Sequence, residues 1–373
     1  MSERTKLFTA YTFPSGVQLN NRVVMAPMTN FLSNEDGSVS DKEIAYYKRR
    51  AEGLGAVITA CANVNESGKG FDYEIGAHRD DLIPGLKKLA DAIHEQGTKA
   101  ILQIFHGGRM VPARLVPNQD VLSASAVPAL REGSATPRAM TEEEIQQTIV
   151  DFGEATRRAI EAGFDGVEIH GANTYLVQQF FSPHSNRRDD QWGGSVEDRM
   201  NFPIAVVESV RKAVAKHAKN PFVIGYRFSP EEKEEPGITM DDTLQLVDVL
   251  SKQGLDYLHV SLSSFNQGSM RDEGDTKPRI TLIQERVGDI IPVMGVGSLH
   301  TPDEVEQALS TVPLISLGRE LLMEPDWIQK VTEGREEEIR VAMKMKQQEQ
   351  LVIPEPMWTN INSVPNWFPK DDE

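Results

Sequence analysis

Short apolar runs alternate along this chain with amphipathic stretches that have the periodicity of helices. Eight of the runs are rich in β-branched residues and lack polar alternation, which is typical of strands buried on both faces. These runs span residues 22–26, 56–60, 99–105, 165–170, 222–228, 256–261, 291–296 and 313–317. Eight β–α units of this length predict an α/β fold, the (β/α)8 TIM barrel.

Two further segments are expected to complete the barrel. Residues 8–19 have the pattern of a hairpin around Pro14-Ser15-Gly16, which we expect to close the bottom of the barrel. Thr141 is followed by three glutamates, a capping box that predicts a helix through Ala162, ended by Gly163. The segment 106–140 is long for a connection between a strand and a helix, and segments of that length are usually lids or binding loops.

The C-terminal part has a different composition from the repeated units. A charged stretch at 336–350 predicts a helix, and the tail after it contains Trp358, Trp367 and Phe368. We therefore expect a barrel domain over residues 1–335. The helix and tail of residues 336–373 would pack on the barrel or extend from it, and the aromatic side chains suit either a partner subunit or the barrel core.

Composition narrows the possible partners. The net charge of −17 argues against nucleic acid or an anionic membrane as partner, and no apolar run approaches the length of a spanning helix. With no signal-like core behind Met1, we expect a cytoplasmic protein, a monomer or homodimer acting on a small molecule. The single cysteine, Cys61, excludes an intrachain disulfide and a cluster with several cysteine ligands; we expect it to be buried, and we expect no metal.

Polar residues interrupt three of the predicted strands. Arg227 lies near the end of its strand, His170 closes another, and Gln103 lies inside a third. A buried guanidinium is costly unless an anion or a strong acceptor compensates it. Because the chemistry of barrels is carried out at the carboxyl ends of the strands, these positions indicate an active site.

A dipeptide that begins with glycine follows each of the last two predicted strands. Gly297-Ser298 comes after the seventh strand and Gly318-Arg319 after the eighth. The loops at these positions commonly form a phosphate site in barrels, and an arginine there can add a bidentate contact. The alternative is that the glycines only end the strands.

The fourth strand leads into His170-Gly-Ala-Asn173-Thr-Tyr175. If the chain becomes helical here, His170 and Asn173 share a face. Two neutral donors side by side can bind one carbonyl oxygen and stabilise negative charge on it, and Tyr175 can supply a proton. On the pattern alone, a buried histidine with unrelated neighbours fits as well. Likewise, Thr29 after the first strand can donate to a ligand or only cap a turn.

Taken together, these features resemble the Old Yellow Enzyme family of FMN-dependent NAD(P)H oxidoreductases, from about residue 7 to residue 325. The segments that carry the resemblance are 21–29, 103–109, 163–170, 181–189, 192–195, Asp198-Arg199 and Gly318-Arg319. Their ordered occurrence over eight units is far more specific than any one motif.

The resemblance implies an FMN over the top of the barrel and a role for each candidate. Ala26, Pro27, Met28, Thr29 and Ala60 would line the ring system, Gln103 would bond its pyrimidine edge, Arg227 would lie near N1 and O2, and Gly297, Ser298, Gly318 and Arg319 would hold the phosphate. NADH or NADPH would reduce the FMN, which would pass hydride to an α,β-unsaturated carbonyl compound, nitro compound, quinone or maleimide. His170 and Asn173 would hold the carbonyl oxygen, and Tyr175 would protonate the α-carbon.

Three positions depart from the family pattern. Thr29 stands where one subgroup has cysteine, Phe31 where that subgroup has tyrosine, and Trp192 where tyrosine is more usual. Other functions remain open from the residues alone: a flavin-free phosphate-binding isomerase or lyase, and an FMN-binding sensor without catalysis. A tRNA-modifying flavin barrel is opposed by the acidic charge balance.

Overall fold

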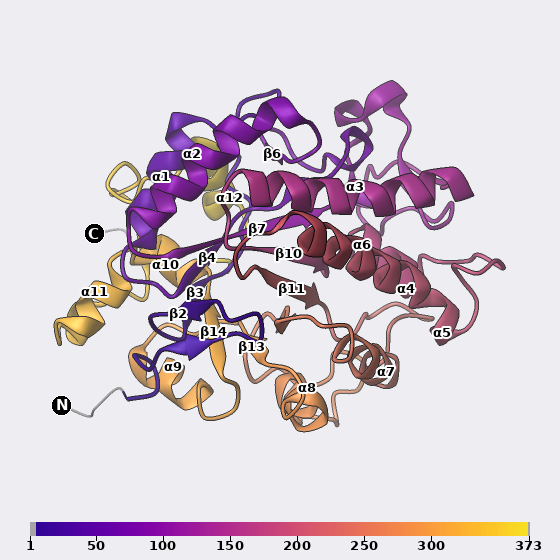
Figure 1. Cartoon of the computed structure of the whole chain (residues 1–373). Helices are drawn as coiled ribbons and strands as arrows, with labels where there is room; N and C mark the ends of the chain where they lie inside the picture. The colour runs from indigo at the N-terminus through magenta and orange to yellow at the C-terminus, as the bar shows by residue number, and fades with distance from the viewer. Residues whose placement is uncertain (1–4, 372–373) are drawn as a thin grey trace.

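The computed structural model describes residues 5–371 and contains a closed barrel of eight parallel strands (Figure 1). The strands are β3 (Val23–Met25), β4 (Ala56–Ile58), β7 (Lys99–Phe105), β10 (Gly166–Gly171), β11 (Val223–Phe228), β12 (Tyr257–Val260), β13 (Val293–Gly295) and β14 (Leu314–Leu317). They pair in this chain order, and β14 pairs with β3 to close the ring. The predicted barrel and all eight of its strands are confirmed.

Helices surround the strands, and several of them follow the strand of the same β–α unit (Figure 1). They are α1 (Asp41–Ala51), α2 (Ile83–His94), α3 (Glu142–Glu161), α4 (Leu176–Phe181), α5 (Val196–Arg199), α6 (Asn201–His217), α7 (Met240–Leu250), α8 (Arg279–Val287), α9 (Pro302–Ala308), α10 (Arg319–Met323), α11 (Trp327–Thr332) and α12 (Glu355–Ser363). Apolar side chains of the strands and helices form one large core between the two layers.

The predicted capping box begins α3. The Thr141 hydroxyl accepts a hydrogen bond from the Glu144 amide, and the Glu144 carboxylate accepts one from the Thr141 amide at 2.8 Å. These bonds satisfy two amides that the first turn of a helix leaves without intrahelical partners. The helix ends before Gly163, whose positive φ of 87° allows the reversal into β10.

The N-terminal hairpin closes the bottom of the barrel. Its strands β1 (Tyr11–Thr12) and β2 (Gln18–Leu19) are antiparallel, and Phe13, Val17 and Leu19 pack with inward side chains of seven barrel strands. The amide of Ser15 at the turn donates to Asp256, just before β12, at 2.7 Å. Because this end is filled by apolar side chains, a ligand can reach the strands only from their carboxyl ends.

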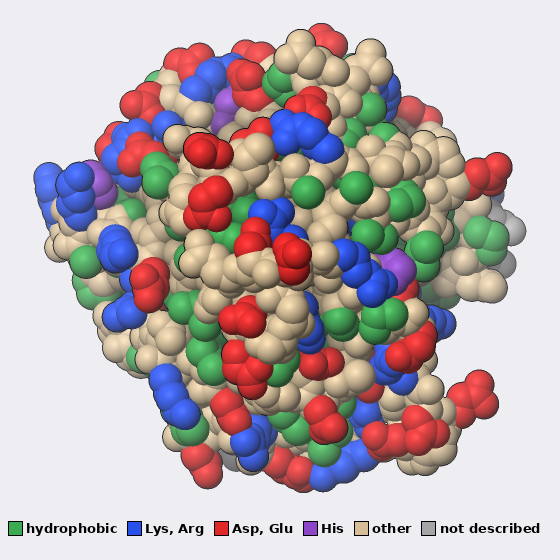
Figure 2. Space-filling model, turned by 90° about the vertical axis from the view of Figure 1, so that its right-hand side faces the viewer, with side chains coloured by type: hydrophobic (Ala, Val, Ile, Leu, Met, Phe, Trp, Pro, Cys, Tyr) green, Lys and Arg blue, Asp and Glu red, His purple; other side chains and the backbone are tan. Residues whose placement is uncertain are grey.

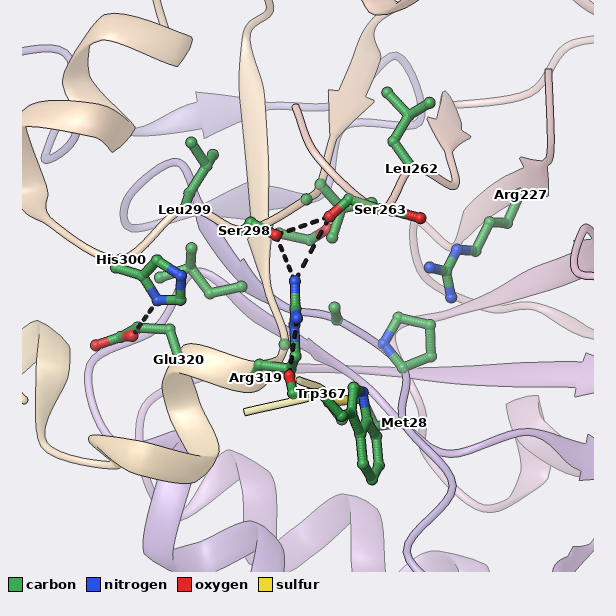
Figure 3. A pocket seen from close by; sticks show the side chains of 17 residues that line it. Met28, Arg227, Leu262, Ser263, Ser298, Leu299, His300, Arg319, Glu320 and Trp367 are labelled. Carbon is green, nitrogen blue, oxygen red and sulfur yellow. Dashed lines mark hydrogen bonds and ion pairs between the residues drawn. The ribbon is translucent and has the colours of Figure 1, made fainter. Parts of the chain in front are cut away.

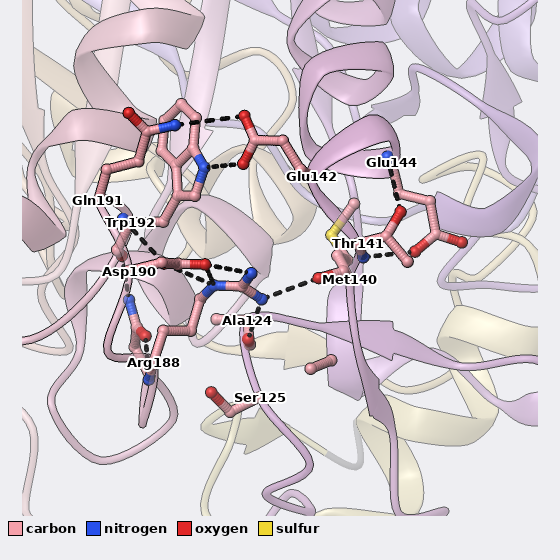
Figure 4. Close-up of polar contacts among 12 residues, drawn as sticks. Ala124, Ser125, Met140, Thr141, Glu142, Glu144, Arg188, Asp190, Gln191 and Trp192 are labelled. Atoms are coloured by element: carbon pink, nitrogen blue, oxygen red, sulfur yellow. Dashed lines mark hydrogen bonds and ion pairs between the residues drawn. The ribbon is translucent and has the colours of Figure 1, made fainter.

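The long segment after β7 is folded rather than irregular. Two short strands, β8 (Leu122–Ser123) and β9 (Arg138–Ala139), pair in parallel at its base, so that residues 124–137 form a crossover loop between them. Arg188 binds this base: one of its nitrogens donates to the carbonyls of Ala124 at 3.1 Å and Met140 at 2.8 Å (Figure 4).

The same base is tied to α3 by Trp192. Its indole nitrogen donates to the Glu142 carboxylate at 2.6 Å, while Asp190 binds the Arg188 guanidinium (Figure 4). Segments 181–189 and 192–195, which belong to the family resemblance, therefore include side chains that fix the crossover loop. Trp192 also packs edge-on against Phe202 of α6, which explains why a larger aromatic residue is accommodated here.

The helix expected at 336–350 is wrong. The chain instead forms a 3-10 turn at Glu336–Glu338, then β15 (Met343–Lys344), which pairs with β16 (Lys370–Asp371), and the helix α12 lies further on. Packing on the barrel overrides helix propensity, because Met343, Leu351 and Ile353 join the main core. Trp358 and Phe368 are buried in the same core, so both side chains fold back on the barrel of their own chain.

Acidic and basic side chains are interspersed on the face of the molecule seen in Figure 2. Many of them pair with opposite charges, such as Arg138 with Asp120 and Glu144. Within residues 5–371, no helix is both long and apolar enough to cross a membrane.

A buried carboxyl organises the loop that follows β3. Glu43 of α1 is fully buried and accepts hydrogen bonds from Asn30 at 3.0 Å and Ser33 at 2.6 Å. Burial raises the pKa of Glu43 to about 7, and these two bonds offset only part of the increase. The folded protein therefore favours the protonated carboxyl.

We predict that Glu43→Gln flattens the pH dependence of stability. In the wild type, the contribution of Glu43 is complete below about pH 4.5 and is lost as the pH rises through about 7, a loss of up to about 3 kcal/mol. The glutamine keeps the volume and avoids the buried charge. Urea unfolding of both proteins between pH 5 and 8.5 measures the difference; parallel curves, matching the exposed control Glu52→Gln, would contradict the assignment.

Candidate active site

Polar side chains from neighbouring strands lie in register near the carboxyl ends of the barrel strands. Gln103 is opposite Glu168, and His170 is opposite Arg227, which in turn is opposite His259. Side chains at matched positions of adjacent parallel strands point to the same side. The barrel thus brings together three residues that the sequence singled out and two that it did not.

Glu168 is the centre of a buried hydrogen-bond network. Its carboxylate accepts from the Gln103 amide at 2.7 Å, from the Tyr257 hydroxyl at 2.9 Å and from the His259 ring at 2.9 Å. The other nitrogen of His259 lies 2.9 Å from the Ser316 hydroxyl of β14. All five side chains are buried, so the network joins four barrel strands, β7, β10, β12 and β14.

The network holds an ionised carboxylate beside a neutral imidazole. Burial opposes ionisation of Glu168, but His259, Arg227 and Gln103 outweigh it and lower the pKa of the carboxyl. Burial lowers the pKa of His259 despite the carboxylate. Neutral His259 then donates to Glu168 and accepts from Ser316, and the negative charge of Glu168 balances the positive charge of Arg227. Sequence reasoning missed His259, although its place in an apolar strand was a signal of the same kind as Arg227.

Arg227 is buried to 8% exposure and lines a cavity of about 290 Å³ (Figure 3). Burial lowers the pKa of its guanidinium, and Glu168 opposes that decrease. Its Nε is buried without a hydrogen-bond partner among the described residues. A buried donor of this kind is costly, so the side chain is suited to an acceptor group placed in the cavity.

The opposite side of this cavity has the features of a phosphate site. Arg319, the first residue of α10, donates to the Ser298 hydroxyl and to the Trp367 carbonyl at 2.9 Å (Figure 3). Gly297 has a φ of 131°, and a Cβ there would lie 2.6 Å from the backbone nitrogen of Phe265. Only glycine allows this close backbone approach. Gly297, Ser298, Gly318 and Arg319, the residues that the sequence assigned to a phosphate site, all line the cavity, and so does the tail residue Trp367, which the sequence did not assign to the site.

The strand-end residues of the first two units complete this surface. Ala26, Pro27 and Met28 line the same cavity. The Thr29 side chain is hydrogen-bonded to the buried thiol of Cys61. Burial raises the pKa of this thiol well above its usual value. Ala60 is buried, and its amide donates to the Tyr47 hydroxyl at 2.6 Å.

The expectation that His170 and Asn173 share a helix face is wrong. β10 continues to Gly171, Asn173 and Thr174 have positive φ angles of 56° and 66°, and α4 begins only after Tyr175. A tight turn is favoured here because the backbone of Asn173 donates to the Ser229 hydroxyl after β11. Sequence spacing alone gave no sign of this bond between two loops.

Each of the two side chains is nevertheless held as a donor. The Ala172 amide donates to Nδ1 of His170 at 3.3 Å, which leaves the ring proton on Nε2. Burial and then Arg227 lower the pKa of His170 to about 3, so the ring is neutral near pH 7. The Ser261 hydroxyl donates to Oδ1 of Asn173 at 2.9 Å, which leaves its amide nitrogen free to donate.

Tyr175 lies in a second, smaller cavity of about 140 Å³. Its ring packs edge-on against His170, with centroids 4.9 Å apart, and against Phe105 at 5.1 Å. Burial raises the pKa of Tyr175, so the phenol keeps its proton at neutral pH. The remaining lining residues of this cavity are Phe31, Gly70, Phe71, Asp72, Met110, Pro112 and Arg131. Of these, sequence reasoning had noted only Phe31 by its position.

These features fit a flavin mononucleotide. An anionic phosphate matches Arg319 and the open backbone at Gly297; the ring system matches the small apolar residues at the end of β3; and the unpartnered Arg227 can donate to a ring oxygen or nitrogen. The fold and the site therefore define a flavin-binding barrel oxidoreductase.

Comparison with known proteins identifies the family. The sequence profile of the NADH:flavin oxidoreductase / NADH oxidase family matches residues 6–338, and the chain belongs to this family. The enzyme uses FMN as cofactor and NADH or NADPH as hydride donor. The resemblance to Old Yellow Enzymes is thereby confirmed.

Curated relatives cover nearly the whole chain. A probable NADH-dependent flavin oxidoreductase of Bacillus subtilis, YqiG, is 50% identical over 98% of both chains. An NADH:fumarate oxidoreductase of Klebsiella pneumoniae is 44% identical over 96% of this chain, but the match spans only 39% of that protein. An NADH:acrylate oxidoreductase of Vibrio harveyi is 47% identical over 95% of this chain and 35% of its own length.

Solved structures agree on the fold. A 2-naphthoyl-CoA reductase in complex with 2-naphthoyl-CoA superposes with a TM-score of 0.80 at 26% identity, over 90% of this chain and 53% of the other. Morphinone reductase gives 0.76 at 27% identity, over 88% and 89% of the two chains. The Old Yellow Enzyme homologue of Zymomonas mobilis gives 0.75 at 25% identity, over 88% and 93%.

We predict that Arg319→Ala weakens FMN binding roughly 10- to 100-fold, because a charge-assisted contact to the phosphate is lost. Fluorescence titration of the apoprotein with FMN measures the dissociation constant directly. The control is Arg335→Ala, which removes a surface arginine whose ionic partners among the described residues are Glu333 and Glu338. An Arg319→Ala variant that purifies with a full complement of flavin would overturn the phosphate assignment.

Proposed function

We propose that this enzyme is an ene-reductase. It reduces the carbon–carbon double bond of an α,β-unsaturated carbonyl compound, or a related electrophile such as a nitro compound, quinone or maleimide. The observation that carries the proposal is the arrangement at the carboxyl end of β10. The neutral His170 ring packs there against the Tyr175 phenol, with ring centroids 4.9 Å apart. The site thus combines a polarising donor with a proton donor.

When bound, FMN would supply the redox chemistry, the transfer of hydride from the nicotinamide to the acceptor. The residues of the chain would hold and tune it. Arg227 would favour negative charge at the pyrimidine end of the ring system, and the Glu168 carboxylate supports the charge of this guanidinium. Arg319 and Ser298 would bind the phosphate, with Gly297 and Gly318 beside them. Ala26, Pro27, Met28, Thr29 and Ala60 would line the ring, and Gln103, held by Glu168, would hydrogen-bond its edge.

His170 and Asn173 polarise the acceptor. Nε2 of His170 carries the proton, and the amide nitrogen of Asn173 is free, so both can donate to one carbonyl oxygen. As hydride reaches the β-carbon, negative charge develops on that oxygen, and oriented donors in a buried site stabilise it. Neutral donors serve here without the cost of a buried cation.

Tyr175 protonates the α-carbon. Its side chain lines the smaller cavity, its ring packs against His170 and Phe105, and burial raises its pKa, so the phenol holds a proton to give to the α-carbon. One hydride and one proton are then added to the double bond, which gives the saturated carbonyl compound.

The named relatives favour NADH as the donor. Those named for NADH are 36–50% identical to this chain, whereas those named NADPH dehydrogenases are 33–34% identical. Fumarate and acrylate, in two of the names, are α,β-unsaturated carboxylates. Both of those proteins are more than twice as long as this chain, so we use their names only as a guide to substrate chemistry.

The proposal is tested in one cuvette. We expect the purified, yellow holoenzyme to bleach with NADH under anaerobic conditions and to recover its colour when cyclohexenone is added, with cyclohexanone as the product. An enzyme that bleaches but is reoxidised by none of a panel of enones, nitro compounds, quinones and maleimides would instead support an FMN-binding sensor.

We predict that Tyr175→Phe slows reoxidation by cyclohexenone roughly 100-fold or more, while reduction by NADH is unchanged, because only the second half-reaction needs a general acid. Stopped-flow absorbance separates the two rates. Tyr11→Phe, in the hairpin at the bottom of the barrel, serves as the control. Equal slowing of both half-reactions would exclude the proton-donor role.

A further inference from the structure

The cavity beside Tyr175 contains one cation that no protein carboxylate neutralises. Arg131 of the crossover loop lines this cavity, together with the rings of Phe31, Phe71 and Tyr175. Its guanidinium forms no ion pair or side-chain hydrogen bond with any residue between 5 and 371. This is unusual in a protein whose net charge is −17 and whose arginines mostly have acidic partners.

The acidic residue that lines this cavity already has a cationic partner. Asp72, which lines the same cavity, binds Arg114 through both carboxylate oxygens at 2.6 Å. Glu74 is buried and accepts from the Gly70 amide, and burial raises the pKa of this carboxyl well above its usual value. Among the described residues that line the cavity, Arg131 is therefore the charged side chain left without an ionic partner.

The loop that carries Arg131 is anchored on both sides. Arg109 donates to the carbonyls of Val127 at 3.4 Å and Pro128 at 3.2 Å, a few residues before Arg131. Arg188 binds the base of the loop at Ala124 and Met140 (Figure 4). At the tip, a turn closes through the bond from the Ser134 amide to the Arg131 carbonyl at 3.1 Å. These contacts hold the loop backbone beside the cavity, and Arg131 itself is exposed, so its guanidinium can meet an anion that arrives from solvent.

We propose that Arg131 binds an anionic group of the substrate, so that the preferred acceptors are activated alkenes that also carry a carboxylate. This inference rests on the proposed ene-reductase function and names its substrate class. The aromatic side chains accommodate a flat conjugated molecule, with Tyr175 beside the reacting carbons and Arg131 beside the carboxylate. A guanidinium suits this role because its paired N–H groups match the two oxygens of a carboxylate.

The charge of the whole molecule makes this cation important. A net charge of −17 repels anions in solution, and a local cation is needed to draw one into the site. A neutral enone gains nothing from Arg131, whereas an enone with a carboxylate gains a charge-assisted contact. The predicted consequence is a preference between two substrates that differ only in this group.

The test compares trans-4-oxo-2-pentenoate with its methyl ester as acceptors for the holoenzyme and NADH. We expect the wild type to prefer the acid, and Arg131→Gln to lower kcat/KM for the acid roughly 10- to 100-fold while leaving the ester within about twofold. Arg131→Lys keeps the charge and should retain part of the preference. Arg211→Gln, on the outer helix α6, removes the same charge away from the cavity and is the matched control.

A binding measurement makes the outcome independent of turnover. Calorimetric titration of the oxidised holoenzyme with levulinate, a saturated carboxylate analogue, should show weaker binding to Arg131→Gln by the same factor and unchanged binding to Arg211→Gln. Arg114→Gln should also weaken binding, because it frees the Asp72 carboxylate at the cavity.

The results separate the two proposals. Suppose that the ester is reduced and that Arg131→Gln changes kcat/KM equally for the acid and the ester. The role of Arg131 is then overturned and the ene-reductase function stands. Equal binding of levulinate to the wild type and to Arg131→Gln would also overturn the role of Arg131. If neither acceptor is reduced but levulinate binding depends on Arg131, the anion site stands and the ene-reductase function fails.

Discussion

The structure depends most on the balance between two opposite charges inside the barrel, those of Glu168 and Arg227. A lone ion at this depth would shift its pKa or destabilise the fold. Glu168 is satisfied by Gln103, Tyr257 and His259, so it remains ionised and offsets the guanidinium above it. Because these side chains come from four strands, the charge balance also fixes the strand register beneath the cofactor site.

The segments that carry the family resemblance include residues outside the reaction site. Arg188 and Trp192, together with Asp190, bind the base of the crossover loop to α3 and line neither of the two cavities of the site. The Arg188 guanidinium binds two carbonyls, those of Ala124 and Met140, that lie 16 residues apart in sequence, so it holds the two ends of the loop together.

Three arginines around the site differ in what compensates their charge. Arg227 has Glu168 beneath it, Arg319 binds neutral oxygens of Ser298 and Trp367, and Arg131 has no partner among the described residues. An arginine without a carboxylate partner is available to an anion from outside. All three side chains are chemically the same, so the groups that surround each guanidinium decide whether its charge is compensated.

The amino-acid sequence alone determined the barrel, the bottom hairpin and the residues at the strand ends, because these depend on local periodicity and on turn residues such as Gly163 and Gly297. It could not determine the partners of Glu168, the turn at Asn173 or the route of residues 336–371, where a predicted helix gave way to packing on the barrel. Each of these depends on groups that are distant in sequence: His259 lies 91 positions from Glu168, and Ser261 lies 88 positions from Asn173. Only the closed barrel brings such groups within bonding distance, and so only the tertiary structure decided which polar side chains are neutralised and which are left for a ligand.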